Sequence, residues 1–168
     1  MADASGGVDA FERVVGSLDY PMFIVTTVAT DGTRAGCLIG FASQLSIDPP
    51  HFLAGLSKLN HTFRTAARAE RLAIHVVAAA RRDLAELFGE RTGDEIDKFA
   101  HCDWTTGPDG LPILADCAAW FSGPIVDRHD LGDHVGFLVA PDSGSAPAEL
   151  PSLVTFAAVR DLSPGHAS

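Results

Sequence analysis

This sequence has few cysteines, little positive charge and no long hydrophobic run, and each shortage excludes a class of protein. Its three cysteines, Cys37, Cys102 and Cys117, form no C-x-x-C pair. An odd number of widely spaced cysteines predicts neither a disulfide framework nor a zinc ribbon, so we expect reduced thiols. The 12 lysines and arginines stand against 22 acidic residues, and the resulting net charge of -10 opposes nucleic-acid binding.

Signatures of several common protein classes are missing too. The chain has no G-x-G-x-x-G, no P-loop and no G-x-S-x-G, so it predicts no Rossmann nucleotide site and no serine hydrolase. The N-terminus lacks a basic segment followed by a long apolar one, and no run approaches the length that crosses a bilayer. We therefore expect a soluble, cytoplasmic protein without a membrane partner.

What is present favours one domain. The 168 residues, 46% of them apolar, suffice for one core but not for two ordinary domains. The expected organisation is an amphipathic helix over residues 8–18, a barrel over about 20–160 and a short flexible C-terminal tail. Val8, Phe11 and Val15 recur at helical spacing, so we expect this helix to pack on an apolar surface.

Beyond residue 20 apolar runs alternate with helical patterns. A β-hairpin is expected around Asp31-Gly32, because Gly32 can adopt the positive φ of a tight turn. Strands are expected over 22–29, 34–41, 51–56, 72–78, 118–126, 134–140 and 153–159, helices over 62–69 and 81–88, and loops over 90–99, 104–112 and 141–151. We expect Gly89 to end the second of these helices and the last loop to be mobile. The hairpin and the later strands without intervening helices favour antiparallel pairing, and hence an α+β, mainly β fold.

A polar bend over Ala42–Ser46 interrupts the apolar runs and ends at Pro49-Pro50. Prolines fix φ and remove two backbone donors, so this stretch predicts a rigid connection between two strands. The side chains of the bend are also typical of a turn in which they satisfy their own backbone, and that interpretation stays open for Ser43, Gln44 and Ser46.

Further polar groups gather just before the first helix after the double proline. These are Lys58, Asn60, His61 and Thr62. Donors of this kind at a helix start suit a phosphate. Asn60 or Thr62 could equally act as an ordinary helix cap.

Far downstream, Gly132-Asp133-His134 stands between two expected strands. An ordinary hairpin turn is one interpretation, and a functional imidazole oriented by Asp133 is the other. His129 and His134, with Asp130 and Asp133 nearby, match no standard ligand spacing, so we expect no metal site.

The order of these parts resembles the flavin reductase-like family, which has the FMN-binding split-barrel fold. The resemblance spans roughly residues 11–160 and is carried by Asp31-Gly32, Gly36, Ser43, Ser46-Ile47-Asp48-Pro49-Pro50, Thr62 and Gly132-Asp133-His134. It implies an antiparallel split β-barrel with flanking helices, assembled as a homodimer. It also implies FMN, or else FAD, as cofactor, NADH or NADPH as hydride donor, and an oxygenase partner that receives reduced flavin.

The resemblance further implies where the cofactor lies. His134, held by Asp133, is the expected catalytic group beside the flavin and the nicotinamide. The flavin would contact Phe41, Ala42, Ser43, Gln44, Ser46, Lys58, Asn60, His61, Thr62, Phe99 and His134. Phe41 and Phe99 could equally be core residues, and Lys98 is expected to face solvent. Leu38, Gly40 and Phe41 replace hydroxyl and amide side chains that are usual in the family's flavin loop, so backbone N–H groups or Gln44 would substitute.

Several functions therefore stay open. A flavin reductase would pass a hydride from the nicotinamide to the flavin N5, while the protein supplies stacking, distance and exclusion of side reactions. The same fold could serve an oxidoreductase that uses a deazaflavin, or an oxidase. A flavin-binding module without turnover is the remaining reading, which the replaced side chains of the flavin loop favour.

Overall fold

The computed structural model describes residues 4–163, which form a curled antiparallel sheet with helices around it. The strands of the sheet are β1 (Phe23–Ala29), β2 (Arg34–Ile39), β3 (Ala42–Ile47), β4 (Pro50–Ser57), β5 (Ala69–Val76), β8 (Ala119–Asp130), β9 (His134–Val139) and β10 (Ser143–Ser145). A second small sheet pairs β6 (Trp104–Thr106) with β7 (Pro112–Leu114). The helices are α1 (Ala4–Ser17), α2 (His61–Ala66), α3 (Arg82–Glu90) and α4 (Phe156–Val159), with short 3-10 turns η1 (Ala79–Arg81), η2 (Lys98–Ala100) and η3 (Pro108–Gly110).

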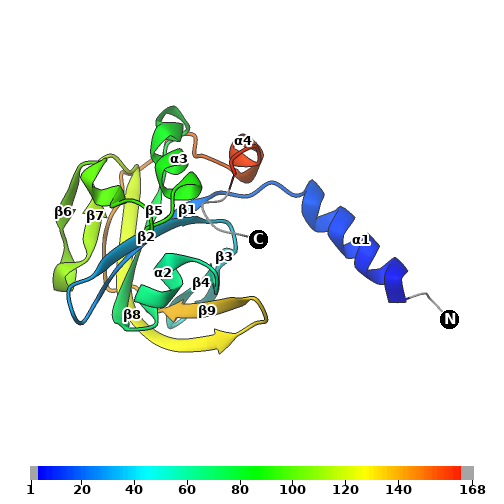
Figure 1. Ribbon diagram of the computed structural model, residues 1–168, viewed down its shortest axis with the longest axis horizontal. Helices are drawn as coiled ribbons and strands as arrows, with labels where there is room; N and C mark the ends of the chain where they lie inside the picture. Colours follow the sequence, from blue (N-terminus) through cyan, green and yellow to red (C-terminus); the bar gives the residue numbers. More distant parts are fainter. Residues whose placement is uncertain (1–3, 164–168) are drawn as a thin grey trace.

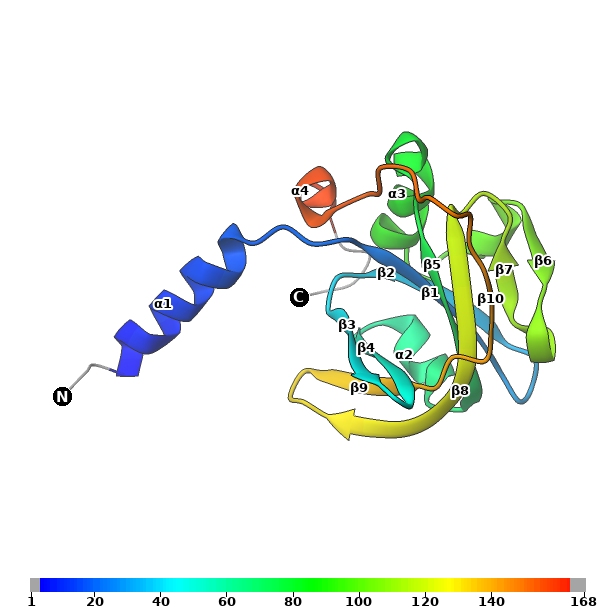
Figure 2. The same cartoon turned by 180° about the vertical axis from the view of Figure 1, so that it is seen from behind.

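The strands follow the order β2-β1-β5-β8-β9-β4-β3, with β10 beside β8. Every one of these pairs is antiparallel. The sheet curls around α2, and the short link Gly40-Phe41 joins its two outer strands, β2 and β3 (Figures 1 and 2). The predicted α+β, mainly β, antiparallel fold is thus confirmed in the form of a half-barrel with flanking helices.

Apolar side chains fill both faces of this curled sheet. Inside the curl, the helix α2 contributes Ala66 and Phe63 to a cluster with Leu56, Ile74 and Phe137. On the outer face, α3, η2 and α4 cover a second cluster built from Met22, Ile24, Val77, Leu84, Phe88, Phe99, Leu114 and Val159. The sheet is apolar on both sides because each face packs against one of these clusters. Each buried side chain stabilises the fold through the apolar area that it removes from water.

The hairpin between β1 and β2 is confirmed, and its turn uses the expected chemistry. Gly32 has φ of 89°, a value that favours glycine. The Asp31 carboxylate accepts the backbone N–H of Thr33 at 3.0 Å and the Arg68 guanidinium at 2.6 Å. These hydrogen bonds lower the pKa of Asp31 to about 2. The turn therefore carries a carboxylate that stays ionised at any ordinary pH.

Helix α1 is present but does not pack on the body of the chain, so that prediction was wrong for the single chain. It starts at Ala4 and ends at Ser17, and it extends away from the sheet (Figures 1 and 2). Val8, Phe11 and Val14 are 56%, 64% and 58% exposed. No helix among residues 4–163 is long and apolar enough to cross a membrane.

Residues 42–46 belong to strand β3, which corrects the predicted polar bend between two strands. Residues of β3 pair with β4 from Ala42 opposite Ala54 to Ile47 opposite Pro50, with a bulge between Gln44 and Ser46. Because β3 lies at the edge of the sheet, polar and exposed side chains are tolerated along it. The tight turn follows the end of β3, at the cis peptide bond between Asp48 and Pro49.

Other boundaries also differ from the expectations. Gly89 lies inside α3 against Leu38 and does not end the helix. The expected loops over 104–112 and 141–151 contain β6 and β10, and β8 continues to Asp130. The expected last strand over 153–159 is reduced to isolated bridges at Leu153 and Thr155, followed by α4. The three cysteines are free, and burial raises the pKa of Cys102 and Cys117 to about 11.

Candidate functional site

A pocket of about 440 Å³ lies where the end of β2, the strand β4, the start of α2 and the β8–β9 hairpin meet. We call it the first pocket; its lining is Tyr20, Met22, Leu38, Ile39, Gly40, Phe41, Gly55, Ser57, Leu59, Asn60, Asp133, His134 and Phe156. The lining is mostly apolar, with a few polar groups among it. This size and composition are typical of a site for a small organic molecule.

The Asp133–His134 pair is the most polar part of the first pocket. The His134 ring nitrogen Nδ1 lies 2.7 Å from Asp133 Oδ1, and this contact lowers the pKa of the Asp133 carboxyl. A carboxylate can only accept, so Nδ1 carries the proton and Nε2 is the nitrogen left for a ligand. The Phe41 ring lies beside the imidazole, with 5.0 Å between ring centroids. Register places the pair: His134 opens β9 directly opposite Ser57 of β4.

At the start of α2, Asn60 acts as the helix cap that the sequence left open. Its Oδ1 accepts the backbone N–H of Thr62 at 2.9 Å, while the residue also lines the first pocket. Thr62 itself is 1% exposed and lies inside the protein. The expected contact between Thr62 and a flavin stays a prediction.

A second pocket, of about 260 Å³, lies between the start of β2, the first residue of α2 and residues 93–99. Its lining includes Gly36, His61, Lys98 and Phe99. Asn60 lines the first pocket, and the next residue, His61, lines the second.

Lys98 and Phe99 are buried, which corrects the expectation that Lys98 faces solvent. The Lys98 ammonium donates to the carbonyls of Gly36 at 2.9 Å and Phe88 at 3.0 Å, and burial lowers its pKa. Phe99 packs edge-on against Phe88 and Trp104, so it is a core residue that also lines the second pocket.

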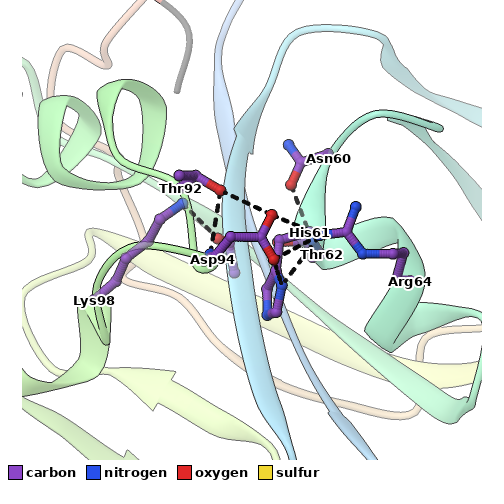
Figure 3. A network of polar contacts seen from close by, with 8 residues as sticks. Asn60, His61, Thr62, Arg64, Thr92, Asp94 and Lys98 are labelled. Carbon is purple, nitrogen blue, oxygen red and sulfur yellow. Dashed lines mark hydrogen bonds and ion pairs between the residues drawn. The ribbon is translucent and has the colours of Figure 1, made fainter. Parts of the chain in front are cut away.

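His61 belongs to a group of polar side chains at the mouth of the second pocket (Figure 3). Its Nδ1 lies 3.0 Å from Asp94 Oδ1, and Arg64 Nη2 donates to both Asp94 oxygens at 2.7 and 2.6 Å. The Asp94 backbone N–H donates to Thr92 Oγ1 at 3.2 Å. Arg64 first and His61 second lower the pKa of Asp94. We call Asp94, His61, Arg64 and Thr92 the Asp94 network.

The remaining predicted contacts are not gathered at the first pocket. Ser43 Oγ donates to the Gln44 carbonyl and Gln44 Nε2 donates to the Ser46 carbonyl. These side chains thus bond to the backbone of their own strand, as one of the two interpretations of the sequence expected. Ala42 and Ser43 line a hollow that shares Phe41, Asp133 and His134 with the first pocket, and Gln44 lines another hollow beside Phe52. Lys58 pairs with Asp130 at 2.9 Å, so its charge is directed at the β8–β9 hairpin.

Sequence reasoning missed the aromatic wall of the first pocket. Tyr20 and Phe156 stack with 5.1 Å between ring centroids, although they are far apart in the sequence. The Phe156 backbone N–H donates to the Tyr20 carbonyl at 2.9 Å. Gly40 makes room for this wall, because a Cβ there would lie 2.6 Å from the Tyr20 ring. No local motif signals these residues, since the tertiary structure alone brings them together.

A curled antiparallel sheet whose pocket joins an aromatic wall to an Asp–His pair is typical of a domain with a site for a small organic molecule. Comparison with known proteins identifies the family. Residues 15–160 match the model of the flavin reductase like domain, and the chain belongs to that family.

Named relatives agree with this assignment. The chain is 32% identical to "FMN reductase (NADH) RutF" of Bradyrhizobium diazoefficiens over 66% of its own length and 62% of the relative. It is 30% identical to "Flavin-dependent monooxygenase, reductase subunit HsaB" of Mycobacterium tuberculosis over 87% of its length and 76% of the relative. A crystal structure of nitrilotriacetate monooxygenase component B from Mycobacterium thermoresistibile superimposes with a TM-score of 0.76 at 26% identity, covering 91% of this chain and 84% of that one. The chain spans only 35% and 48% of two other curated relatives.

Proposed function

We propose that this chain is a flavin reductase that binds FMN, or FAD, in the first pocket and takes a hydride from NADH or NADPH. The observation that carries the proposal is the convergence of Phe41, Asn60 and the Asp133–His134 pair on one mostly apolar pocket. Family membership and the names of the relatives, which include an FMN reductase (NADH), support the same conclusion.

The lining of the first pocket fits a flavin by its chemistry. Phe41 is 63% exposed at the pocket, and an exposed aromatic ring there offers a surface for stacking a planar ring system. Polar groups lie at one side, where Asn60, Ser57 and His134 can serve the polar edge and the ribityl chain. Towards the second pocket, His61 and Lys98 supply cationic or donor groups that suit a phosphate.

The chain's own residues would position the reactants. FMN, when bound, supplies the N5 acceptor for the hydride, so the protein needs no acid or base at the nicotinamide. His134 would hold the nicotinamide against the flavin through Nε2, and Asp133 would keep its ring in that orientation. Phe41 and the Tyr20–Phe156 wall would exclude water from the transfer.

The functional unit that we propose is a homodimer of single-domain chains. Helix α1 exposes Val8, Phe11 and Val14, and the edge strand β3 exposes Leu45 and Ile47. Apolar surface of this kind favours association with another protein surface. The reduced flavin would serve an oxygenase partner, because several relatives are named as reductase components of monooxygenases.

The first test is His134→Ala. We expect flavin reduction by NADH, followed anaerobically by the loss of flavin absorbance, to slow by between about tenfold and a hundredfold, because the nicotinamide loses its orienting contact. Binding of FMN, titrated by fluorescence, should change much less. The matched control is His129→Ala, since His129 pairs with Asp127 outside the pocket and is half-exposed. Equal reduction rates for the two variants would contradict the assigned role of His134.

A flavin-binding module without turnover is the second candidate. Leu38, Gly40 and Phe41 bring no side-chain hydrogen-bonding group to the first pocket, and this feature supports a module that binds flavin without turnover. The same titrations decide between the two: tight FMN binding without oxidation of NADH or NADPH would support the module. Oxidation of NADH or NADPH with a deazaflavin in place of FMN would instead support an oxidoreductase of the same fold that uses a deazaflavin.

A further inference from the structure

The Asp94 network connects a loop to the second pocket, which the Asp94 carboxylate itself does not line. His61, Gly93 and Asp97 are among the residues that line the second pocket, whereas Asp94 meets the pocket only through His61. Asp94 is more than half exposed, with 55% of its side chain accessible. A carboxylate in that position affects a ligand mainly through the side chains it holds.

The geometry fixes how Asp94 holds the imidazole. Because the carboxylate only accepts, the His61 nitrogen 3.0 Å away must be the protonated Nδ1, and Nε2 is left for another partner. The adjacent Gly93 leaves space for the ring, since a Cβ there would lie 2.4 Å from His61 Cδ2 and 3.0 Å from Nε2. Loop and imidazole therefore pack as one unit (Figure 3).

Arg64 makes this arrangement more than an isolated surface pair. Its Nη2 bridges both oxygens of Asp94 and lies 3.5 Å from His61 Nδ1. A single exposed ion pair contributes little, but a carboxylate shared by two cationic or donor groups restricts all of them. Arg34, Asp97 and Lys98 are the other charged groups that line the same pocket.

We infer that Asp94 is a positioning residue: it orients His61 at the second pocket so that the imidazole contacts the phosphate of a flavin mononucleotide whose ring lies in the first pocket. This inference rests on the proposed function. The neighbouring Lys98 ammonium, held by two backbone carbonyls, gives the same pocket a positive charge that suits a phosphate.

The test compares FMN with riboflavin, which lacks the phosphate. In Asp94→Asn, the affinity for FMN should fall roughly threefold to tenfold, the range for one ordinary hydrogen bond. The affinity for riboflavin should not change. Asp127→Asn is the matched control, because it removes the same charge from another aspartate–histidine pair outside both pockets. Fluorescence quenching of the flavin gives both dissociation constants.

A double-mutant cycle shows whether Asp94 acts through His61. In the His61→Ala background, Asp94→Asn should no longer change the ratio of FMN to riboflavin affinity. His61→Gln serves as a second background, and thermal unfolding verifies that each variant is folded. A persisting effect, a tighter binding of FMN in Asp94→Asn, or equal behaviour of the Asp94 and Asp127 variants would overturn the inference. Failure of the unmodified chain to bind either flavin would instead remove the proposed function.

Discussion

At the scale of single residues, His75 shows how a buried histidine can hold two segments together. Its side chain is fully buried in β5, where Nδ1 donates to the Ile24 carbonyl at 3.0 Å and Nε2 accepts the Leu114 N–H at 3.1 Å. The bond from the Leu114 N–H requires the neutral ring, because Nε2 cannot accept once it is protonated. Burial lowers the pKa of His75 to about 4.

This residue predicts a defined pH dependence of stability. The folded pKa lies below the ordinary value of 6.5, so the unfolded chain binds the proton more readily. The contribution is fully present above about pH 6.5 and is lost as the pH falls towards 4, by an amount on the order of 3 kcal/mol. We expect the free energy of unfolding, measured with urea at several pH values in this range, to change less with pH in His75→Gln than in the natural chain. An identical dependence on pH in the two chains would show that His75 does not carry the effect.

At the scale of elements, Arg71 connects three segments that the sequence leaves apart. From β5 its guanidinium donates to both carboxylate oxygens of Asp142, just before β10, and its Nε lies 3.4 Å from Asp109 of η3. Its side chain is 14% exposed, whereas most ion pairs of this chain are more open. The planar guanidinium donates two hydrogen bonds to one carboxylate, and the ammonium group of a lysine cannot reproduce this geometry.

The prediction is that Arg71→Lys loosens the segment around β10. We expect a loss of about 1 kcal/mol in the free energy of unfolding, with faster amide exchange at residues 142–145. Arg81→Lys is the control, because Arg81 also bridges two aspartates, Asp83 and Asp116, but does so at a more exposed position. If both substitutions change amide exchange near β10 equally, the contacts of Arg71 have no special role in holding this segment.

At the scale of the whole molecule, we expect α1 to take part in the association of two chains. Its apolar side chains include Phe11 and Val15, 64% and 40% exposed in the single chain. A helix with one apolar face is not expected to remain unpartnered, because association would remove this surface from water.

Light scattering after size exclusion should therefore find a dimer, and Phe11→Glu should shift it towards the monomer. Arg13→Gln changes the net charge by the same amount on the same helix, and it should leave the dimer intact. A monomeric natural chain, or dimers that dissociate equally in both variants, would contradict this assignment of α1.

The sequence was informative wherever a structure depends on near neighbours. The Asp31-Gly32 turn needs only a glycine and one carboxylate, and the Asp133–His134 contact joins adjacent residues. Helix α2 begins where Asn60 can cap it. These features form through short-range hydrogen bonds and φ preferences, which any reader of the sequence can evaluate.

What the sequence by itself determined is the antiparallel β-rich fold, the hairpin and the residues at the start of α2. The tertiary structure alone decided that Lys98 is buried, that Tyr20 stacks on Phe156, and that Asp94 reaches His61. The physical reason is that such contacts depend on how distant segments pack. Their energy comes from burial and shared partners, which no local pattern encodes.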